Sequence, residues 1–502
     1  MTPIDYSDVQ GLAAYGYAKM VEARYWLLRV RDAAAARAWI AWAPVSTAER
    51  RQPPPEKALQ VAFTAPGLRA LGLAPSTIAG FSDEFLAGMS APANRCQRLG
   101  DVGVSDPAGW QWGGPRKQPD LVVMLYAKTS LGAWEQSVQN DRWQAAFDTI
   151  ATLETSDMGG LEPFGFTDGI SQPAFDWERQ RPVPGTTTVY DNRGALGELL
   201  LGYPNEYDKY TDRPLLSPAE DPSGDLLPAE DDPACKDLGR NGTYLVLRQL
   251  EQDVRGFWQY LNYAAGGHAP ERYRLGTAMV GRGIDGEPLI PPSRTAVPGV
   301  VDKPGQPRNA FTYDHDPEGV ECPIGAHIRR ANPRNADLFG HPHGVIAGLG
   351  NRLAIPRPKL HDDLMASTRF HRVLRRGREY GVKITPEEAL QPAPPGEVAR
   401  GLQFACLCAN ILRQFEFVQN AWLMSTKFDG LTDESDPLLG NRAAVGDCPV
   451  TGCFSIPREG KLPQHLTGVP QFITVRGGAY FFMPSMRALR YIARGGGSGA
   501  AH

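Results

Sequence analysis

The chain has 502 residues, which is long for one hydrophobic core and predicts either two domains or one domain with large insertions. Its 52 lysines and arginines nearly balance 56 aspartates and glutamates, for a net charge of −4, which argues against nucleic acid or an anionic membrane as the main partner. Seven cysteines are too few, and odd in number, for a disulfide framework.

The first third of the chain alternates predicted strands and helices. Period-two apolar patterns indicate strands, and a polar residue before an apolar helical stretch indicates a helix start. These patterns predict a strand over 24–30, a helix over Asp32–Trp42, a strand through Leu59, Val61 and Phe63, an N-cap at Thr64, a strand over Asp120–Ala127 and a mostly helical Gly132–Thr155.

A similar order of elements returns in the last half of the chain. Gly477-Gly478 between two apolar runs is typical of a two-residue hairpin turn, and Pro484 suits the start of a helix. The patterns predict a strand over Gly242–Leu250 leading into a helix, a strand over Gly401–Cys408 leading into the helix Ala409–Met424, and a hairpin of Gln471–Arg476 with Ala479–Phe482.

Two similar halves of this kind predict an α+β protein with two packed sheets. Residues 178–240 and 283–372 are rich in Pro, Gly and Asp and lack periodicity, so we expect long ordered insertions there.

Two residue types that suit iron chemistry stand far apart in the sequence. Asp168 lies in Gly165-Phe-Thr-Asp-Gly169, where flanking glycines allow a carboxylate to approach a ligand closely. His327 lies in Gly325-Ala-His-Ile-Arg329, and a neutral imidazole can bind haem iron. Alone, the first pattern is typical of a turn and the second of a packed histidine.

Four longer blocks around these residues resemble the signatures of dye-decolourising (DyP-type) haem peroxidases, and the long insertions resemble those of the larger subgroups of this family. They occur in the family's order, and with Asp8-Val-Gln-Gly11 they cover nearly the whole chain. The blocks are Gly165–Pro173, Ala326–Arg329 followed by Asn332-Pro-Arg334, Val373–Gly381, and Thr474–Ser485.

The resemblance implies two ferredoxin-like domains, each an antiparallel sheet covered by helices. Residues 1–157 would form the N-terminal domain, 158–494 the haem-binding domain with insertions, and 495–502 a disordered tail. It also implies one haem b per chain, hydrogen peroxide as oxidant, and phenolic or dye-like aromatic electron donors. A haem carrier or iron-handling protein without turnover is the alternative, although a carrier would need neither Asp168 nor Arg375.

The same resemblance assigns roles to single residues. His327 would bind the iron, Asp168 would be the distal acid and base, and Arg375 would stand beside the peroxide and reach a haem propionate. Arg375 is preferred to the adjacent Arg376 because its distance from Gly381 resembles the family spacing.

Other residues would complete the site. Arg329 and Arg334 are candidates for contacts with the propionates, and Leu402 and Phe404, two apart on a strand, would form the wall of a narrow pocket. An iron-bound histidine usually donates its second N–H to a carboxylate.

For that acceptor, Asp436 resembles the family position, and Glu416 is the rival. The other histidines, among them His341 and His343, lack a supporting motif.

No apolar segment approaches the ~20 residues that span a bilayer. The first residues carry neither a basic region before an apolar run nor a twin-arginine signal, which predicts a cytoplasmic protein without a membrane partner. An oligomer is compatible with the sequence.

Overall fold

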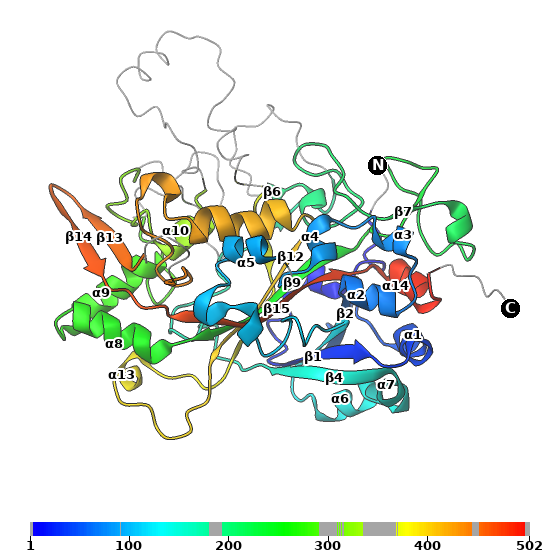
Figure 1. Ribbon diagram of the computed structural model, residues 1–502, viewed down its shortest axis with the longest axis horizontal. Helices are drawn as coiled ribbons and strands as arrows, with labels where there is room; N and C mark the ends of the chain where they lie inside the picture. Colours follow the sequence, from blue (N-terminus) through cyan, green and yellow to red (C-terminus); the bar gives the residue numbers. More distant parts are fainter. Residues whose placement is uncertain are drawn as a thin grey trace, which may run out of the picture.

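A mixed sheet-and-helix architecture is seen in the computed structural model, which describes residues 4–90, 92–179, 193–290, 309, 311, 313, 316–334, 368, 370–443 and 451–496. Its centre is a nine-stranded antiparallel sheet (Figure 1). The strand order is β10-β12-β9-β15-β2-β3-β1-β4, and β11 also pairs with β12. The strands are β1 (Glu22–Val30), β2 (Lys57–Phe63), β3 (Leu121–Ala127), β4 (Phe147–Glu154), β9 (Thr243–Gln252), β10 (Leu374–Arg375), β11 (Arg378–Tyr380), β12 (Gly401–Cys408) and β15 (Ile473–Met483).

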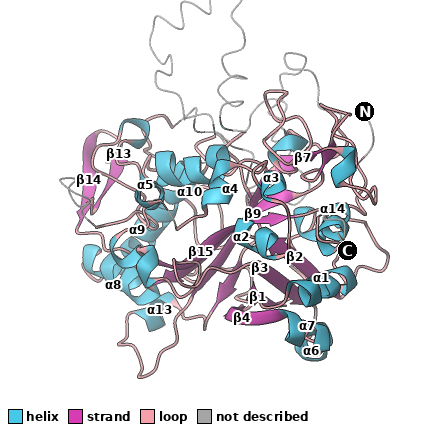
Figure 2. Cartoon of the chain, turned by 45° about the vertical axis from the view of Figure 1, so that its right-hand side comes forward, coloured by secondary structure: helices cyan, strands magenta, loops and turns pink. Residues whose placement is uncertain are grey.

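Helices surround the two ends of this sheet. Figure 2 shows α8, α9 and α13 gathered at one end and α1, α6, α7 and α14 at the other. The helices are α1 (Ala33–Trp42), α2 (Ala65–Ala70), α3 (Pro75–Ile78), α4 (Asp83–Ala87), α5 (Ala93–Leu99), α6 (Gly132–Val138), α7 (Asp141–Ala146), α8 (Val254–Ala264), α9 (Ala269–Val280), α10 (His327–Ala331), α13 (Pro386–Ala389) and α14 (Met486–Ala493). Two π-helical segments cover Leu412–Glu416 and Val418–Met424, and short strand pairs are β5 (Ala174–Phe175) with β6 (Arg193–Gly194), β7 (Leu215–Leu216) with β8 (Lys236–Asp237), and β13 (Cys453–Arg458) with β14 (Lys461–Thr467).

The sheet consists of two halves. Strands β1 to β4 form one, and β9, β10, β11, β12 and β15 form the other. The halves meet where β2 lies beside β15, through the residue pair Phe63–Phe482. The α+β class with two antiparallel halves is therefore confirmed, but the halves join edge to edge instead of packing as separate sheets. The junction is short, since one residue pair joins the two strands, and the Gln10 side chain bonds the backbone C=O and N–H of Val61 further along β2.

Each face of the sheet carries its own hydrophobic core. Along β3, Leu121, Val123 and Leu125 belong to one core, and Val122 and Met124 belong to the other. All five are buried. Because successive side chains of a strand point to opposite faces, a continuous apolar run such as β3 marks a strand that is covered on both sides.

The N-cap predicted at Thr64 is confirmed, and α1 begins with a further cap at Asp32. The Asp32 side chain accepts the backbone N–H of Ala35 at the start of α1, and Thr64 accepts that of Gly67 at the start of α2. Each cap satisfies one of the backbone donors that a helix start leaves unpaired.

The predicted helix over Gly132–Thr155 is wrong in its second half, which forms β4 at the edge of the sheet. Phe147, Ile150 and Leu153 recur every third residue, as on a helix face. The pairing of β4 with β1 is interrupted by a bulge at Ile150, opposite Leu27 and Leu28. Because the bulge adds one residue, Phe147 and Leu153 fall into different cores and the period of two is lost.

The predicted hairpin turn at Gly477-Gly478 is also wrong, since both glycines lie inside the continuous strand β15. A Cβ atom on Gly477 would lie 2.4 Å from Nε1 of Trp112, whose indole is fully buried against the strand. The glycine therefore permits a close approach of a neighbouring side chain, which is the other common reason for glycine in a strand.

Other predictions agree in part. The helix expected from Ala409 begins at Leu412 and is π-helical. Of the two expected insertions, residues 180–192 and most of 291–367 lie outside the described residues, as do residues 497–502 of the tail. Among the described residues no helix is long and apolar enough to cross a membrane.

Candidate active site

A cavity of about 300 Å³ lies between the second half of the sheet and the segments around α10. Its apolar walls include Leu250 from β9, and Leu402 and Phe404 from β12. The π-helical segment Val418–Met424 contributes Trp422 and Leu423. The volume and the largely apolar lining are typical of pockets for small molecules and cofactors.

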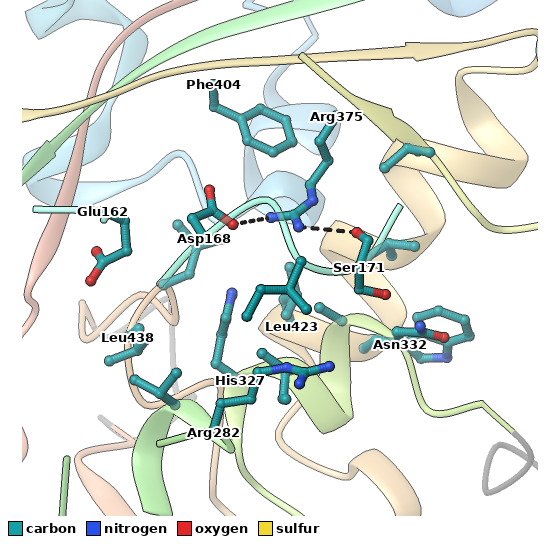
Figure 3. Close-up of a pocket in the computed structure, with 18 of the residues that line it drawn as sticks. Glu162, Asp168, Ser171, Arg282, His327, Asn332, Arg375, Phe404, Leu423 and Leu438 are labelled. Atoms are coloured by element: carbon teal, nitrogen blue, oxygen red, sulfur yellow. Dashed lines mark hydrogen bonds and ion pairs between the residues drawn. The ribbon is translucent and has the colours of Figure 1, made fainter. Parts of the chain in front are cut away.

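His327 reaches this cavity from the first position of α10. Its Nδ1 lies 2.9 Å from Oδ2 of Asp436, and Oδ1 of Asp436 accepts the backbone N–H groups of Leu438 and Leu439 at 2.9 and 2.8 Å. With Nδ1 bonded to the carboxylate, Nε2 is the nitrogen left for the cavity, and 31% of the imidazole is exposed there. In Figure 3 the ring points toward Asp168 and Arg375.

The His327–Asp436 contact shifts the pKa of both groups. Burial acts to lower the pKa of His327, but the charge and hydrogen bond of Asp436 outweigh it, so the pKa is raised. Burial acts to raise the pKa of Asp436, but His327, the backbone N–H groups and Arg330 lower it below its ordinary value. Asp436 is therefore a buried carboxylate anion held by its donors.

Asp168 and Arg375 form an ion pair on the side of the cavity toward which His327 points (Figure 3). Nη1 of Arg375 donates to Oδ1 of Asp168 at 3.0 Å, and Nη2 donates to the carbonyl of Ser171 at 3.2 Å. Gly165 and Gly169, on either side of Asp168, have φ angles of 101° and 73°, which disfavour any residue with a side chain.

The ion pair keeps Asp168 ionised. Burial acts to raise its pKa, but the Arg375 charge, a backbone N–H and the nearby His327 outweigh this effect, so the pKa lies below its ordinary value. Arg375 itself is held in β10, which pairs with β12.

The two adjacent arginines point to different places. Arg375 lines the cavity, whereas Arg376 donates from Nε to the carbonyl of Leu12 at 2.8 Å, in the N-terminal segment. The structure thus brings the preferred arginine of the pair to Asp168 and His327.

The two arginines expected near the propionates are also separated. Arg334 lines the cavity, where it donates to the carbonyl of Phe311 at 2.8 Å and packs on the Phe311 ring. Arg329 lies outside the cavity lining and is fully buried. It donates to Oδ2 of Asp316 at 3.1 Å and to the carbonyl of Cys322 at 2.7 Å, so it braces the segment before His327.

Glu416, the rival of Asp436, lies in a different buried cluster. Its Oε1 is 2.9 Å from Nε of Arg95 and accepts the Tyr480 hydroxyl at 2.9 Å. Of the two carboxylates, Asp436 is the one that contacts His327.

Several lining residues are not signalled by a sequence motif. His371 lines the cavity, but its Nδ1 lies 2.5 Å from the carbonyl of Arg413 and its ring stacks on Phe417. Burial lowers its pKa to about 4. Glu162 also lines the cavity, beside the loop of Asp168. His315, His341, His343 and His361 lie outside the described residues.

The donor set fits a haem. Within the described ranges no group of three or more His, Cys, Asp or Glu side chains could hold a bare metal ion. One imidazole nitrogen facing an apolar cavity is instead the donor that a porphyrin-bound iron requires. Arginines in the lining, among them Arg334 and Arg372, could pair with the carboxylates of such a group.

Comparison with known proteins finds relatives that are named peroxidases. A multifunctional dye peroxidase of an Amycolatopsis species is 30% identical over 86% of this chain and 83% of its own length. Peroxidase 2 of the fungus Mycetinis scorodonius is 27% identical over 97% of this chain and 87% of its own. No family model matches the chain.

Solved structures agree on the fold. A fungal DyP-type peroxidase from Auricularia auricula-judae superimposes with a TM-score of 0.70 at 23% identity, covering 98% of this chain and 100% of that one. An ancestral D-type dye-decolourising peroxidase gives a TM-score of 0.69 at 25% identity, covering 97% and 99%. The sequence relationship and the shared fold together show that this chain belongs to the dye-decolourising peroxidase family.

Proposed function

We propose that the cavity binds one haem b and that His327 is its protein ligand. Family membership makes the chain a hydrogen-peroxide-dependent haem peroxidase and favours this activity over haem carriage. The observation that supports the assignment of the site is that His327, anchored by Asp436, points across an apolar cavity to the Asp168–Arg375 pair. The donors we propose are phenolic and dye-like aromatic compounds.

Haem would supply the iron that binds peroxide and the capacity to store its oxidising equivalents. The protein's part begins with His327, whose Nδ1–H donates to Asp436. This bond fixes the ring and its tautomer and increases the basicity of Nε2. Arg334 is our candidate for a contact with a haem carboxylate, because it lines the cavity whereas Arg329 does not.

Asp168 would move the proton of the peroxide. Its carboxylate accepts the proton from one peroxide oxygen and returns it to the other, which then departs as water. Because its pKa lies below the ordinary value, the carboxylate stays a base in acidic solution. Arg375, always charged, would stabilise the negative charge that develops on the departing oxygen.

Leu402 and Phe404 would keep the cavity narrow and dry. Hydrogen peroxide is small enough for such a space, whereas a bulky dye would be oxidised at the protein surface by electron transfer through Trp or Tyr. One haem b per chain, a cytoplasmic location and a domain boundary after residue 157 remain predictions from the sequence.

The test is an absorption spectrum of the purified protein with haem, before and after peroxide, in three forms. His327→Ala should lose haem or shift the Soret band, while wild type and His371→Ala, which removes the other described histidine of the lining, should keep the band. Peroxide-dependent oxidation of a phenol should accompany the band. A wild-type spectrum in His327→Ala would reject the ligand assignment. A haem complex without peroxide turnover would support the alternative function, a haem carrier.

A further inference from the structure

Glu162 places a second carboxylate at the cavity, six residues before Asp168, and none of the steps above uses it. Both of its oxygens accept hydrogen bonds. Oε1 accepts the backbone N–H of Phe166 at 3.0 Å, and Oε2 accepts the backbone N–H of Phe164 at 3.0 Å and Nε2 of Gln252 at 2.8 Å.

These bonds fold the loop around the Glu162 carboxylate. The Glu162 N–H donates to the Phe166 carbonyl and the Gly165 N–H donates to the Glu162 carbonyl, both at 2.8 Å. Beyond this turn, the Asp168 N–H donates to the carbonyl of Gly160 at 3.0 Å. The backbone of Asp168 is therefore placed by a turn whose centre is the Glu162 side chain.

The same carboxylate ties the loop to the sheet. Gln252 ends β9, and β9 pairs with β12, which in turn pairs with β10. Arg375 lies in β10. Both members of the Asp168–Arg375 pair are thus positioned relative to one sheet, Arg375 directly and Asp168 through Glu162 and Gln252.

We infer that Glu162 is a positioning residue that holds the Asp168 carboxylate against Arg375. The inference rests on the proposed function, since it matters only where Asp168 carries the proton. Burial raises the pKa of Glu162 to about 7, and above this pH the carboxylate accepts from three partners that are all N–H donors. An amide at residue 162 would set an NH₂ group against at least one of them. A group displaced by about 1 Å can lose on the order of 10²-fold in rate.

The experiment is a double-mutant cycle on the haem-bound protein with Glu162→Gln, Asp168→Asn and both together. Glu162→Gln alone should slow the reaction with peroxide by on the order of 10-fold to 10²-fold, with the Soret band unchanged. In the Asp168→Asn background it should cause no further loss, because its effect passes through Asp168. Deuterium exchange of residues 161–168 should be faster in Glu162→Gln than in wild type.

A matched control is Glu388→Gln. The Glu388 carboxylate also accepts a backbone N–H, from Thr385 at 2.7 Å, but it lies outside the cavity lining. This control should leave both the peroxide rate and the exchange of residues 161–168 as in wild type. If Glu162→Gln does not fold, Gln252→Ala removes the tie to β9 alone and should give the same non-additive loss with Asp168→Asn.

The outcomes separate this inference from the proposed function. An unchanged rate and unchanged exchange in Glu162→Gln, or an equal loss with and without Asp168→Asn, would overturn the inference while the proton role of Asp168 stands. An Asp168→Asn protein with the wild-type rate would overturn that proton role, and the positioning role would fall with it. Slow reaction, fast exchange and non-additivity together would establish Glu162 as the positioning residue.

Discussion

Replacing Arg375 and Arg376 one at a time separates chemistry from stability at two adjacent positions. Arg375 donates to Asp168 in the cavity, and Arg376 donates to the carbonyl of Leu12 outside it. Arg375→Leu should therefore impair the reaction with peroxide, and Arg376→Leu should impair the fold.

The expected sizes follow from these contacts. Loss of one preorganised donor at a developing negative charge typically costs about 10²- to 10³-fold in rate, or ~3–4 kcal/mol. In Arg375→Leu the burial of Asp168 would also no longer be opposed by the guanidinium, so the pKa of Asp168 should rise and the loss should be largest in acid. Arg376→Leu removes a charged hydrogen bond to a backbone carbonyl, which is worth ~1.5–3 kcal/mol of folding stability.

Two measurements on the same proteins check this pair. Stopped-flow absorbance at the Soret band gives the rate of the reaction with peroxide from about pH 3 to about pH 7, a range around the reference pKa of ~3.9. Urea unfolding gives the stability. A slow Arg376→Leu with a fast Arg375→Leu would refute the assignment, as would equal rates in both.

Three further substitutions test single contacts. Asp168→Asn should slow the peroxide step by ~10²- to 10⁴-fold and flatten its pH profile, because the wild-type pKa is lowered and the carboxylate remains a base as pH falls toward 4; stopped-flow rates check this. Asp436→Asn turns an NH₂ donor toward Nδ1 of His327 and so favours the tautomer with a proton on Nε2, the nitrogen proposed to bind iron. Haem affinity should therefore fall ~10- to 100-fold, which a transfer assay to a haem scavenger measures. Glu416→Leu leaves Arg95 buried without its carboxylate and should cost ~3–5 kcal/mol in urea unfolding with the Soret band unchanged.

How far the sequence predicted the fold depended on whether local patterns matched tertiary pairing. The strand β3 was predictable because it is a continuous apolar run covered on both faces, and β9 and β12 each contain an apolar stretch that is buried in the same way. The strand β4 was not, because a bulge at Ile150 in its pairing with β1 removes the period of two. The sequence predicts a turn at Gly477-Gly478 because it does not reveal that Trp112 packs against Gly477.

Some residues of the candidate site could likewise be predicted from the sequence, and others could not. Residues inside dense motifs, such as His327 and Asp168, could be predicted because their neighbours identify the family. Asp436 and Glu416 could not be separated, since each is a carboxylate in an apolar context and only the three-dimensional contact with His327 decides. Glu162 gave no signal, because its partners are mostly backbone N–H groups, which every sequence offers.

Charge balance explains how the buried Asp436 can coexist with a neutral His327. An imidazole must be unprotonated at Nε2 to bind iron, so it brings no full positive charge to its carboxylate partner. Arg330 and Arg442 supply positive charge near Asp436 instead. Nη2 of Arg442 donates to the Asp436 backbone carbonyl at 2.9 Å. Arg330 donates to the carbonyls of Trp422 and Ser425, and its charge helps to lower the pKa of Asp436.

Burial lowers the pKa of Arg330 and of Arg442 to about 10, so both side chains remain charged at neutral pH. Asp436 therefore faces two cations that no proton exchange on His327 can remove. Asp436 therefore remains an anion beside Nδ1 of His327, which would increase the electron density that the imidazole offers to a bound iron. The segment that presents His327 to the cavity, α10, also carries Arg330, so one short helix would provide both the proposed ligand and part of the charge that keeps Asp436 ionised.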